Sequence, residues 1–455
     1  MFPALAAARL LLSAAPAACS GLDLPAALQA VVERSDEVAI KVLERSSAEA
    51  DLSLARAIGF VPEANVTVTG GAVPGAHGNI LQAQDGYTNR SLQDLGPFVR
   101  LDANIVQPVW TWGQLDGARD AASAGVAARG ALIADAVSQV QLRVARLFWG
   151  HALAQKLISI TGSVDKALLE VDQRLAQAIA NNDATISPND RYRVEVFKTE
   201  LLRRKADAAK ALRMTEVGIA ATLSMDTTQL QLADIRLPSS HRSIPDLSQV
   251  VEMAERQRPD LLAVSHAIDA RKAQVSAAEG ARLPQIFLAG QFSFAYAGNR
   301  DLQTNPWVYD PFREVSGGVV LGARQDLAIH VKTIEADKAR AEVAVLERQQ
   351  AALRRLVRAQ VESAHAELVA SAARNEASVG GAATAKAWFR AVEMNFGVGV
   401  EDARTLIDSY TAFVESQVLV ATTSYDALVA RAQLDQAAGS PLARSEGSCV
   451  RPELP

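Results

Sequence analysis

The stretch FVRLDANIVQ, residues Phe98 to Gln107, alternates between apolar and polar side chains. In an extended strand this alternation gives one apolar face and one polar face. The apolar positions are Val99, Leu101, Ala103 and Ile105, and the polar positions are Arg100, Asp102 and Asn104. A strand of about ten residues can cross a bilayer beside a wet interior. An antiparallel sheet packed on helices alternates in the same way, so this stretch alone leaves both options open.

The same order of predicted elements occurs in both halves of the sequence. Residues 31–70 align with residues 253–292, with Pro62 opposite Pro284, and each copy has two helical stretches, a proline and a strand. We predict strands at about 64–72, 98–107, 285–297 and 314–322. The chain is accordingly divided into a first repeat, 22–245, and a second repeat, 246–440.

The connections between the strands favour a membrane location. Residues 73–97 and 298–313 are polar and rich in Gly, Asn and Asp, and the second connection carries Trp307, Tyr309 and Phe312, which suit a membrane interface. Four strands are too few to close a barrel, because bacterial barrels begin at about eight, and an open edge in lipid leaves backbone groups unpaired. Several chains would therefore share one barrel.

Most of the remaining sequence predicts long helices, at about 114–180, 188–225, 329–394 and 402–438. Apolar residues recur with heptad spacing, for example at Val137, Val140 and Val144. A helix of about 65 residues is on the order of 100 Å long and needs partners along its length. The fold class predicted is mainly α with a small β part: two long coiled-coil hairpins and four antiparallel strands. Asp402 is predicted to cap the helix that restarts after Gly397 and Gly399.

The two ends of the chain have separate predictions. Residues 1–18 resemble a signal peptide, with one arginine, a short apolar segment and small residues before the end. Cys19 is a possible lipidation site, which would anchor the new N-terminus in a membrane. Residues 441–455 are predicted to be a disordered tail; they contain Cys449, the only other cysteine, so a disulfide framework is excluded.

Composition and motifs exclude several classes of function. The net charge of -5 argues against nucleic acid as a partner. No stretch approaches the 18 or so apolar residues of a spanning helix, which leaves a soluble protein or a membrane β-barrel. The six histidines are scattered over surface or helix-face positions, and we find no metal-ligand spacing, phosphate loop or nucleophile elbow. The sequence therefore predicts neither an enzyme nor a cofactor.

Two stretches resemble the TolC family of outer-membrane efflux proteins: the strand-to-helix segment Gln107–Ala128, which begins QPVWTWG, and the last helix with the turn before it, Phe396–Gly439. The resemblance covers about residues 22–440. It implies a homotrimer with a twelve-stranded barrel in the outer membrane and a helical tunnel extending through the periplasm. The implied function is the passive exit duct of a tripartite efflux or type I secretion system, for small molecules, ions or polypeptides. The implied partners are a periplasmic adaptor and an inner-membrane transporter.

The resemblance also implies roles for residues at the two hairpin tips. The expected adaptor contacts are Asn181, Asn182 and Asp183 at one tip, and Phe396, Gly397, Gly399, Glu401 and Asp402 at the other. Asp408, with Thr405 one turn earlier, is expected at the pore constriction. The alternatives are an ordinary hairpin turn without a partner and a solvated surface aspartate. For the whole chain, the alternative function is a non-channel periplasmic coiled-coil scaffold or adhesin.

Overall fold

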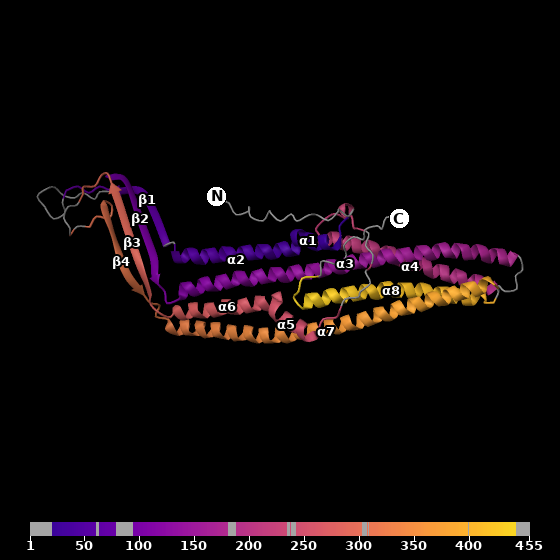
Figure 1. Ribbon diagram of the computed structural model, residues 1–455. Helices are drawn as coiled ribbons and strands as arrows, with labels where there is room; N and C mark the ends of the chain where they lie inside the picture. The colour runs from indigo at the N-terminus through magenta and orange to yellow at the C-terminus, as the bar shows by residue number, and fades with distance from the viewer. Residues whose placement is uncertain are drawn as a thin grey trace, which may run out of the picture. The chain divides into compact units, whose positions relative to one another are not determined.

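The computed structural model describes residues 21–60, 63–78, 94–180, 188–233, 237, 243–302, 307, 309–398 and 400–442. The predicted signal segment 1–18, Cys19 and all but the first two residues of the predicted tail 441–455 lie outside them. In chain order the elements are α1 (Leu24–Arg34), α2 (Asp36–Phe60), β1 (Glu63–Pro74), β2 (Leu95–Trp110), α3 (Gln114–Ala180), α4 (Pro188–Thr222), the 3-10 helix η1 (Thr227–Gln229), α5 (Leu247–Gln257), α6 (Pro259–Gly280), β3 (Gln285–Ala297), β4 (Glu314–Arg324), α7 (Ile329–Gly397) and α8 (Ala403–Ala437) (Figure 1). Apart from η1, the order helix, helix, strand, strand, helix, helix occurs twice.

The chain forms two compact units, and each takes segments from both halves of the sequence. The first unit comprises Met1–Leu43, Ala131–Leu262 and Ala352–Pro455. The second comprises Glu44–Gly130 and Ala263–Ala351, and it contains the whole sheet. In the described part of the chain, none of the helices combines the length and the apolar character that crossing a membrane requires.

The sheet has four antiparallel strands in the order β1-β2-β3-β4, which confirms the predicted β part. Strand β2 begins and ends three residues beyond the predicted 98–107 stretch. Its pairing with β3 shifts register between Pro108 and Trp110, because proline has no backbone N–H to donate to the ladder.

A tight turn joins β2 to α3 inside the second unit. Trp112 and Gly113 both have positive φ, 53° and 84°, which a glycine adopts freely and a tryptophan does not. The indole Nε1 of Trp112 donates a hydrogen bond of 2.8 Å to the Pro284 carbonyl, at the start of β3. At Gly280 a Cβ atom would lie 2.6 Å from the Trp112 carbonyl oxygen, so only glycine allows this close approach. The motif QPVWTWG thus fixes the direction in which α3 leaves the sheet.

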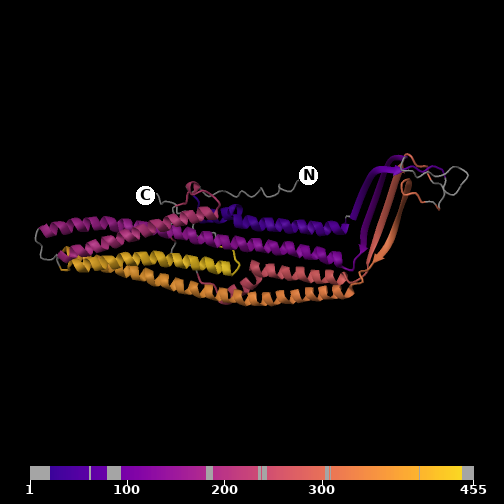
Figure 2. The ribbon, with the colours of Figure 1, turned by 180° about the vertical axis from the view of Figure 1, so that it is seen from behind.

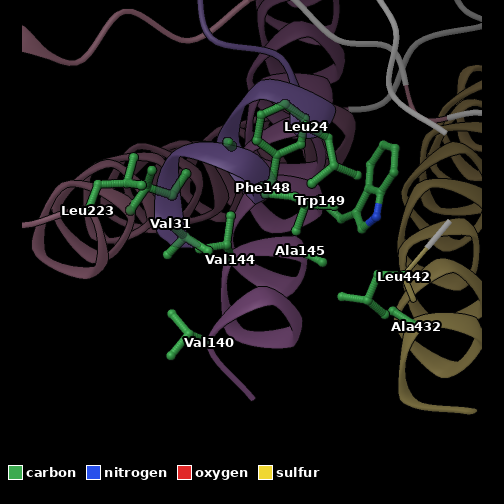
Figure 3. Close-up of a cluster of buried hydrophobic side chains, with 14 of the residues drawn as sticks. Leu24, Val31, Val140, Val144, Ala145, Phe148, Trp149, Leu223, Ala432 and Leu442 are labelled. Carbon is green, nitrogen blue, oxygen red and sulfur yellow. The ribbon is translucent and has the colours of Figure 1, made fainter. Parts of the chain in front are cut away.

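The main core of the first unit gathers side chains from α1, α3, α4 and α8 (Figure 3). Phe148 and Trp149 of α3 meet edge to face, with ring centroids 6.0 Å apart. Val140 and Val144, two of the residues with heptad spacing, are fully buried here. The heptad pattern therefore marks the side of α3 that packs, as expected for a coiled coil.

The two long hairpins of the first unit, α3 with α4 and α7 with α8, use different side chains. Four buried apolar residues connect α3 and α4: Val164, Leu168, Val194 and Leu201. Along α7 and α8, which lie side by side in both views (Figure 2), an apolar cluster that includes Val357, Val361 and Leu434 gives way, nearer the tip, to buried small polar side chains. The Asn375 amide donates hydrogen bonds to the hydroxyls of Thr423, at 3.2 Å, and Ser424, at 2.8 Å. The mainly helical fold with two long hairpins is the one predicted.

Candidate functional site: the two faces of the sheet and the start of α8

One face of the sheet is apolar across all four strands. Register places Val68 opposite Leu101, Leu101 opposite Phe294, and Phe294 opposite Val315. Further members of this face are Val66, Val99, Ile105, Leu288, Phe292, Tyr296, Val319 and Leu321, all of which are exposed, Val319 to 71%. A continuous apolar surface of this kind is unusual in contact with water and marks a surface that another molecule or a lipid covers.

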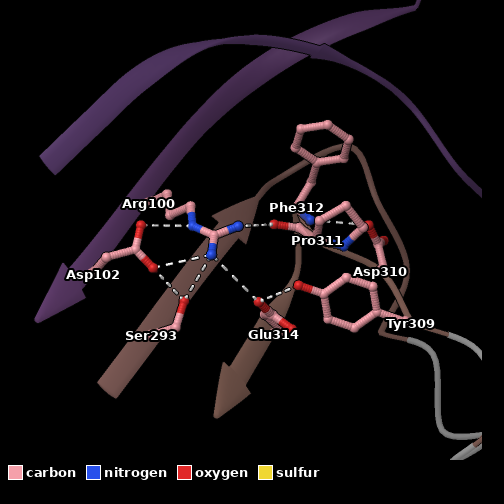
Figure 4. Close-up of polar contacts among 8 residues, drawn as sticks. All are labelled: Arg100, Asp102, Ser293, Tyr309, Asp310, Pro311, Phe312 and Glu314. Atoms are coloured by element: carbon pink, nitrogen blue, oxygen red, sulfur yellow. Dashed lines mark hydrogen bonds and ion pairs between the residues drawn. The ribbon is translucent and has the colours of Figure 1, made fainter. Parts of the chain in front are cut away.

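The opposite face carries the polar side chains. Its rows include Thr67, Asp102, Ser293 and Ser316, and next to them Thr69, Arg100, Ala295 and Glu314. Arg100 holds the Asp102 carboxylate with both Nε, at 2.8 Å, and Nη2, at 3.0 Å (Figure 4). Ser293 donates its hydroxyl to Asp102 at 2.7 Å. Arg100 and Asp102 are two of the polar positions of the opening sequence stretch, and the structure puts them on one face as predicted.

The two outer strands each have one free edge. In the described sheet β1 pairs only with β2, and β4 only with β3. An unpaired edge presents a row of backbone N–H and C=O groups that can pair with a strand of another chain.

The start of α8 has the predicted cap. Asp402 has extended backbone geometry, and its Oδ1 accepts hydrogen bonds from the Thr405 N–H at 2.8 Å and the Thr405 hydroxyl at 2.7 Å. These bonds, the backbone one first, lower the pKa of Asp402, and the charges of Arg404 and Arg193 contribute further. Arg193 belongs to the first turns of α4, so the starts of α4 and α8 lie near each other.

The predicted constriction residues are one turn apart but differ in their contacts. The Thr405 hydroxyl is engaged by Asp402. Asp408 is exposed, and its carboxylate lies 3.8 Å from the Arg404 guanidinium on the same helix. Exposure in one chain is compatible both with a pore position and with a solvated surface aspartate.

The remaining tip residues are partly described. Phe396 and Glu401 are half-buried, and Gly397 is exposed at the end of α7. The N–H groups of Val398 and Val400 donate to the Asn395 carbonyl and close the turn. Asn181, Asn182, Asp183 and Gly399 lie outside the described residues.

The sequence pattern does not reveal how the β3–β4 connection contacts the sheet. Arg300 and Asp310 form a buried ion pair of 2.9 Å, and Phe312 packs edge to face on Phe98 with centroids 5.3 Å apart. The sequence predicts Phe312 at a membrane interface with Trp307 and Tyr309; the last two are exposed, whereas Phe312 lies against the polar face of the sheet. Among the described residues, we find no group of His, Cys, Asp and Glu arranged to hold a metal ion.

Comparison with known proteins agrees with this geometry. Residues 250–440 match the family described as outer membrane efflux protein. No curated protein matches the chain. Among solved structures, the outer-membrane channel OprN is 14% identical, with 92% of this chain and 90% of that chain covered and a TM-score of 0.75.

Two further structures share the fold. The open state of the MtrE outer membrane channel of Neisseria gonorrhoeae is 16% identical, with coverage of 95% and 94% and a TM-score of 0.74. The CmeC outer membrane channel of Campylobacter jejuni is 12% identical, with coverage of 96% and 92% and a TM-score of 0.71. At these identities the likeness shows a common fold. Together with the family match over residues 250–440, this likeness agrees with the predicted resemblance: the chain has the fold of the outer-membrane channels, and its second half matches the outer membrane efflux protein family.

Proposed function

We propose that three copies of the chain form a channel through the outer membrane that serves as the exit duct of an efflux assembly. The observation that carries the proposal is the four-stranded sheet, which is apolar on one face, polar on the other and unpaired at both edges. Four strands cannot close alone, whereas β4 of one copy and β1 of the next can pair, and three copies would give a twelve-stranded barrel. Lipid would then cover the apolar face, and the polar face would line the lumen.

In this proposal the duct is passive, and an inner-membrane transporter supplies the energy. A periplasmic adaptor would contact the hairpin tips at Asn181, Asn182 and Asp183 and at Phe396, Gly397, Gly399, Glu401 and Asp402. The exposed Gly397 supports this role, since a position without a side chain lets a partner helix approach closely. Opening would move the α7–α8 hairpin outward, which adaptor binding at the tips could favour.

Asp408 is the proposed constriction residue, with Thr405 beside it. Its exposed carboxylate supports the role, because three copies around the threefold axis would form an anionic ring that favours cations. The Asp408→Asn variant should lower the cation-to-anion permeability ratio. The matched control is Glu415→Gln, two turns further along α8, whose carboxylate contacts Arg204. An unchanged ratio in Asp408→Asn would leave Asp408 as a solvated surface residue.

Planar-bilayer recording of the purified chain tests the duct itself. We expect stepwise, cation-selective conductance, together with a compact, detergent-resistant trimer on a gel run without boiling. A well-folded trimer that gives no conductance would support the periplasmic scaffold instead. The cargo class follows from which transporter and adaptor co-purify with the chain, since drugs, metal ions and polypeptides use different pumps.

A further inference from the structure

Burial on the polar face of the sheet is confined to one end. Ser293, Ala295 and Ala297 are buried, whereas Gln291, on the same face of β3, is exposed. The residues between them point to the other face and are exposed: Phe292, Phe294 and Tyr296. The part of the chain that buries these three residues therefore lies over the polar face alone, at the end of β3 that leads into the β3–β4 connection.

Residues 309–313 of that connection form the cover, and we call them the strap. The Pro311 carbonyl accepts a hydrogen bond of 3.4 Å from Nη1 of Arg100 (Figure 4). The Phe312 ring packs on Phe98, which shares the polar face with Arg100. Tyr309 donates its hydroxyl to Glu314 Oε1 at 3.1 Å, and Arg100 Nη2 lies 3.9 Å from the same oxygen. Arg100 is thus the side chain that connects β2, β3 and the strap.

A buried ion pair fixes the base of the strap. Arg300 and Asp310 are only 7% and 4% exposed in their side chains. Arg300 also donates to the Pro74 carbonyl at 2.6 Å, and its guanidinium lies 5.0 Å from the Phe312 ring centroid. Asp310 Oδ1 accepts the Phe312 N–H at 3.0 Å. Breaking one partner of a buried pair leaves an uncompensated charge, so the pair holds the strap in one position against the end of β1.

We propose that the strap narrows the lumen at the loop end of the channel and limits the size of solute that passes there, with Arg100 as its positioning residue. This inference rests on the proposed function, because the polar face lines a lumen only if copies of the chain close around it. The ring of Tyr309, 70% exposed, projects from the strap. In the assembly three such rings would surround the opening, and hydrogen bonds to Glu314 would restrict their motion.

Cysteine labelling tests whether the strap covers the sheet. Ala297 is fully buried, so a reagent should not reach this position while the strap is in place. Gln291, on the same face of β3, is exposed. In the purified full-length protein we expect a water-soluble maleimide to label the Ala297→Cys variant at least tenfold more slowly than Gln291→Cys. Peptide mass spectrometry assigns the label, since the chain also has Cys19 and Cys449. Adding Arg100→Ala should bring the two rates close together, and Arg100→Lys should preserve most of the difference. If Ala297→Cys and Gln291→Cys are labelled at equal rates while Arg100 is intact, the strap does not cover the sheet.

Single-channel conductance tests whether the strap limits passage. Releasing it with Arg100→Ala should raise the conductance roughly twofold and admit larger polyethylene glycols into the pore. If this variant loses the detergent-resistant trimer, Asp310→Asn is the second release variant. If the release variant speeds the labelling of Ala297→Cys but leaves the conductance unchanged, the strap does not narrow the lumen. Silence of the unmodified trimer would instead refute the channel itself, so the two failures can be told apart.

Discussion

The two long hairpins of the first unit have similar helices but differ in the middle of their contacts. Between α3 and α4, apolar side chains such as Leu168 and Leu201 are buried. Between α7 and α8, the middle of the contact buries Ser371, Asn375 and Ser424 instead. Apolar burial stabilises in proportion to the area removed from water, whereas a net hydrogen bond contributes about 1 kcal/mol and depends on direction. Apolar burial therefore holds the α3–α4 contact, whereas directional hydrogen bonds fix the register in the middle of the α7–α8 contact, between the tip and the apolar cluster of Val357, Val361 and Leu434.

This difference agrees with the proposed opening movement. In the middle of the contact, small polar side chains let α7 and α8 approach closely and part again without exposing large apolar surfaces. The apolar cluster of Val357, Val361 and Leu434 would hold the two helices together at the end away from the tip. Nearer the tip, Phe389 stacks on Phe413 with centroids 5.8 Å apart, and Tyr410 packs towards the α3–α4 cluster. The tip of α8 is thus held by aromatic contacts, and these are the contacts that a partner at the tip would have to change.

The largest expected effect comes from removing an apolar contact between α3 and α4. Leu201→Ala should destabilise the protein by about 2 to 5 kcal/mol, because Leu201 is only 6% exposed and the substitution leaves a cavity. Thermal unfolding of the purified protein measures the loss. The neighbouring Leu202→Ala, at a side chain that is 64% exposed, is the matched control and should change stability by less than about 0.5 kcal/mol. Similar losses in both variants would contradict the apolar character of this contact.

The next effect concerns Asn375. Asn375→Ala should cost about 1 to 3 kcal/mol, because the Thr423 and Ser424 hydroxyls lose their buried partner. The triple variant Asn375→Leu, Thr423→Val, Ser424→Ala replaces the whole network by apolar groups and should recover most of that stability. If the contact exists to allow separation, the triple variant should also reduce the fraction of time that channels are open. The exposed neighbour Glu376→Gln is the control for both readouts.

A smaller, pH-dependent effect is expected at the α3–α4 contact. His151 is buried, its Nδ1 lies 3.4 Å from the Thr215 hydroxyl, and burial lowers its pKa below the ordinary 6.5, opposed by the charge of Glu216. The unfolded chain therefore takes up a proton more readily than the folded one, and stability falls as the pH drops below 6.5. Melting temperatures measured at about pH 7.5 and 5.5 should differ less in His151→Gln. The His365→Gln variant, which removes a half-buried histidine of α7, is the control for the substitution itself.

The smallest effect is local to the start of α8. Asp402 has a folded pKa below 3.8, so its capping contribution is present above that value and is lost as the pH falls through the lower folded value. Hydrogen exchange of the Thr405 amide should show this loss in the unmodified protein. Asp402→Ala should remove the protection at every pH, and Asp402→Asn should keep it without the pH dependence. Identical exchange in the alanine and asparagine variants would show that the cap does not hold this turn.

Local patterns in the sequence predict much of this fold. Alternation at Val99, Arg100 and Leu101 is sufficient to assign two faces to a strand, because side chains of a strand point to opposite sides by geometry alone. The cap at Asp402 is also a local signal, and the structure confirms it. The contact between Arg300 and Asp310 could not be predicted, because it depends on how a connection folds back over the sheet. Phe312 shows the same limit: its aromatic character suits an interface, but a tertiary contact with Phe98 decides its position.

The polar contact between α7 and α8 lies between these cases. Asn375 and Ser424 occupy helix positions that heptad spacing would give to apolar residues, so the sequence shows that the pattern is interrupted but not why. The pairing of the amide with two hydroxyls is visible only when both helices are in place. The proposed pore role of Asp408 has no local signal at all, since an exposed aspartate on a helix has the same sequence context in either case.

The free edges of β1 and β4 have a consequence for cells that produce an altered copy of this protein. If neighbouring copies pair edge to edge as proposed, a copy that is sound at β1 but defective at β4 would still join a ring and leave a gap in its wall. One defective subunit would then inactivate a trimer that contains two intact subunits. Mutations in β4 should therefore behave as dominant traits, whereas mutations that unfold the whole chain should behave as recessive ones.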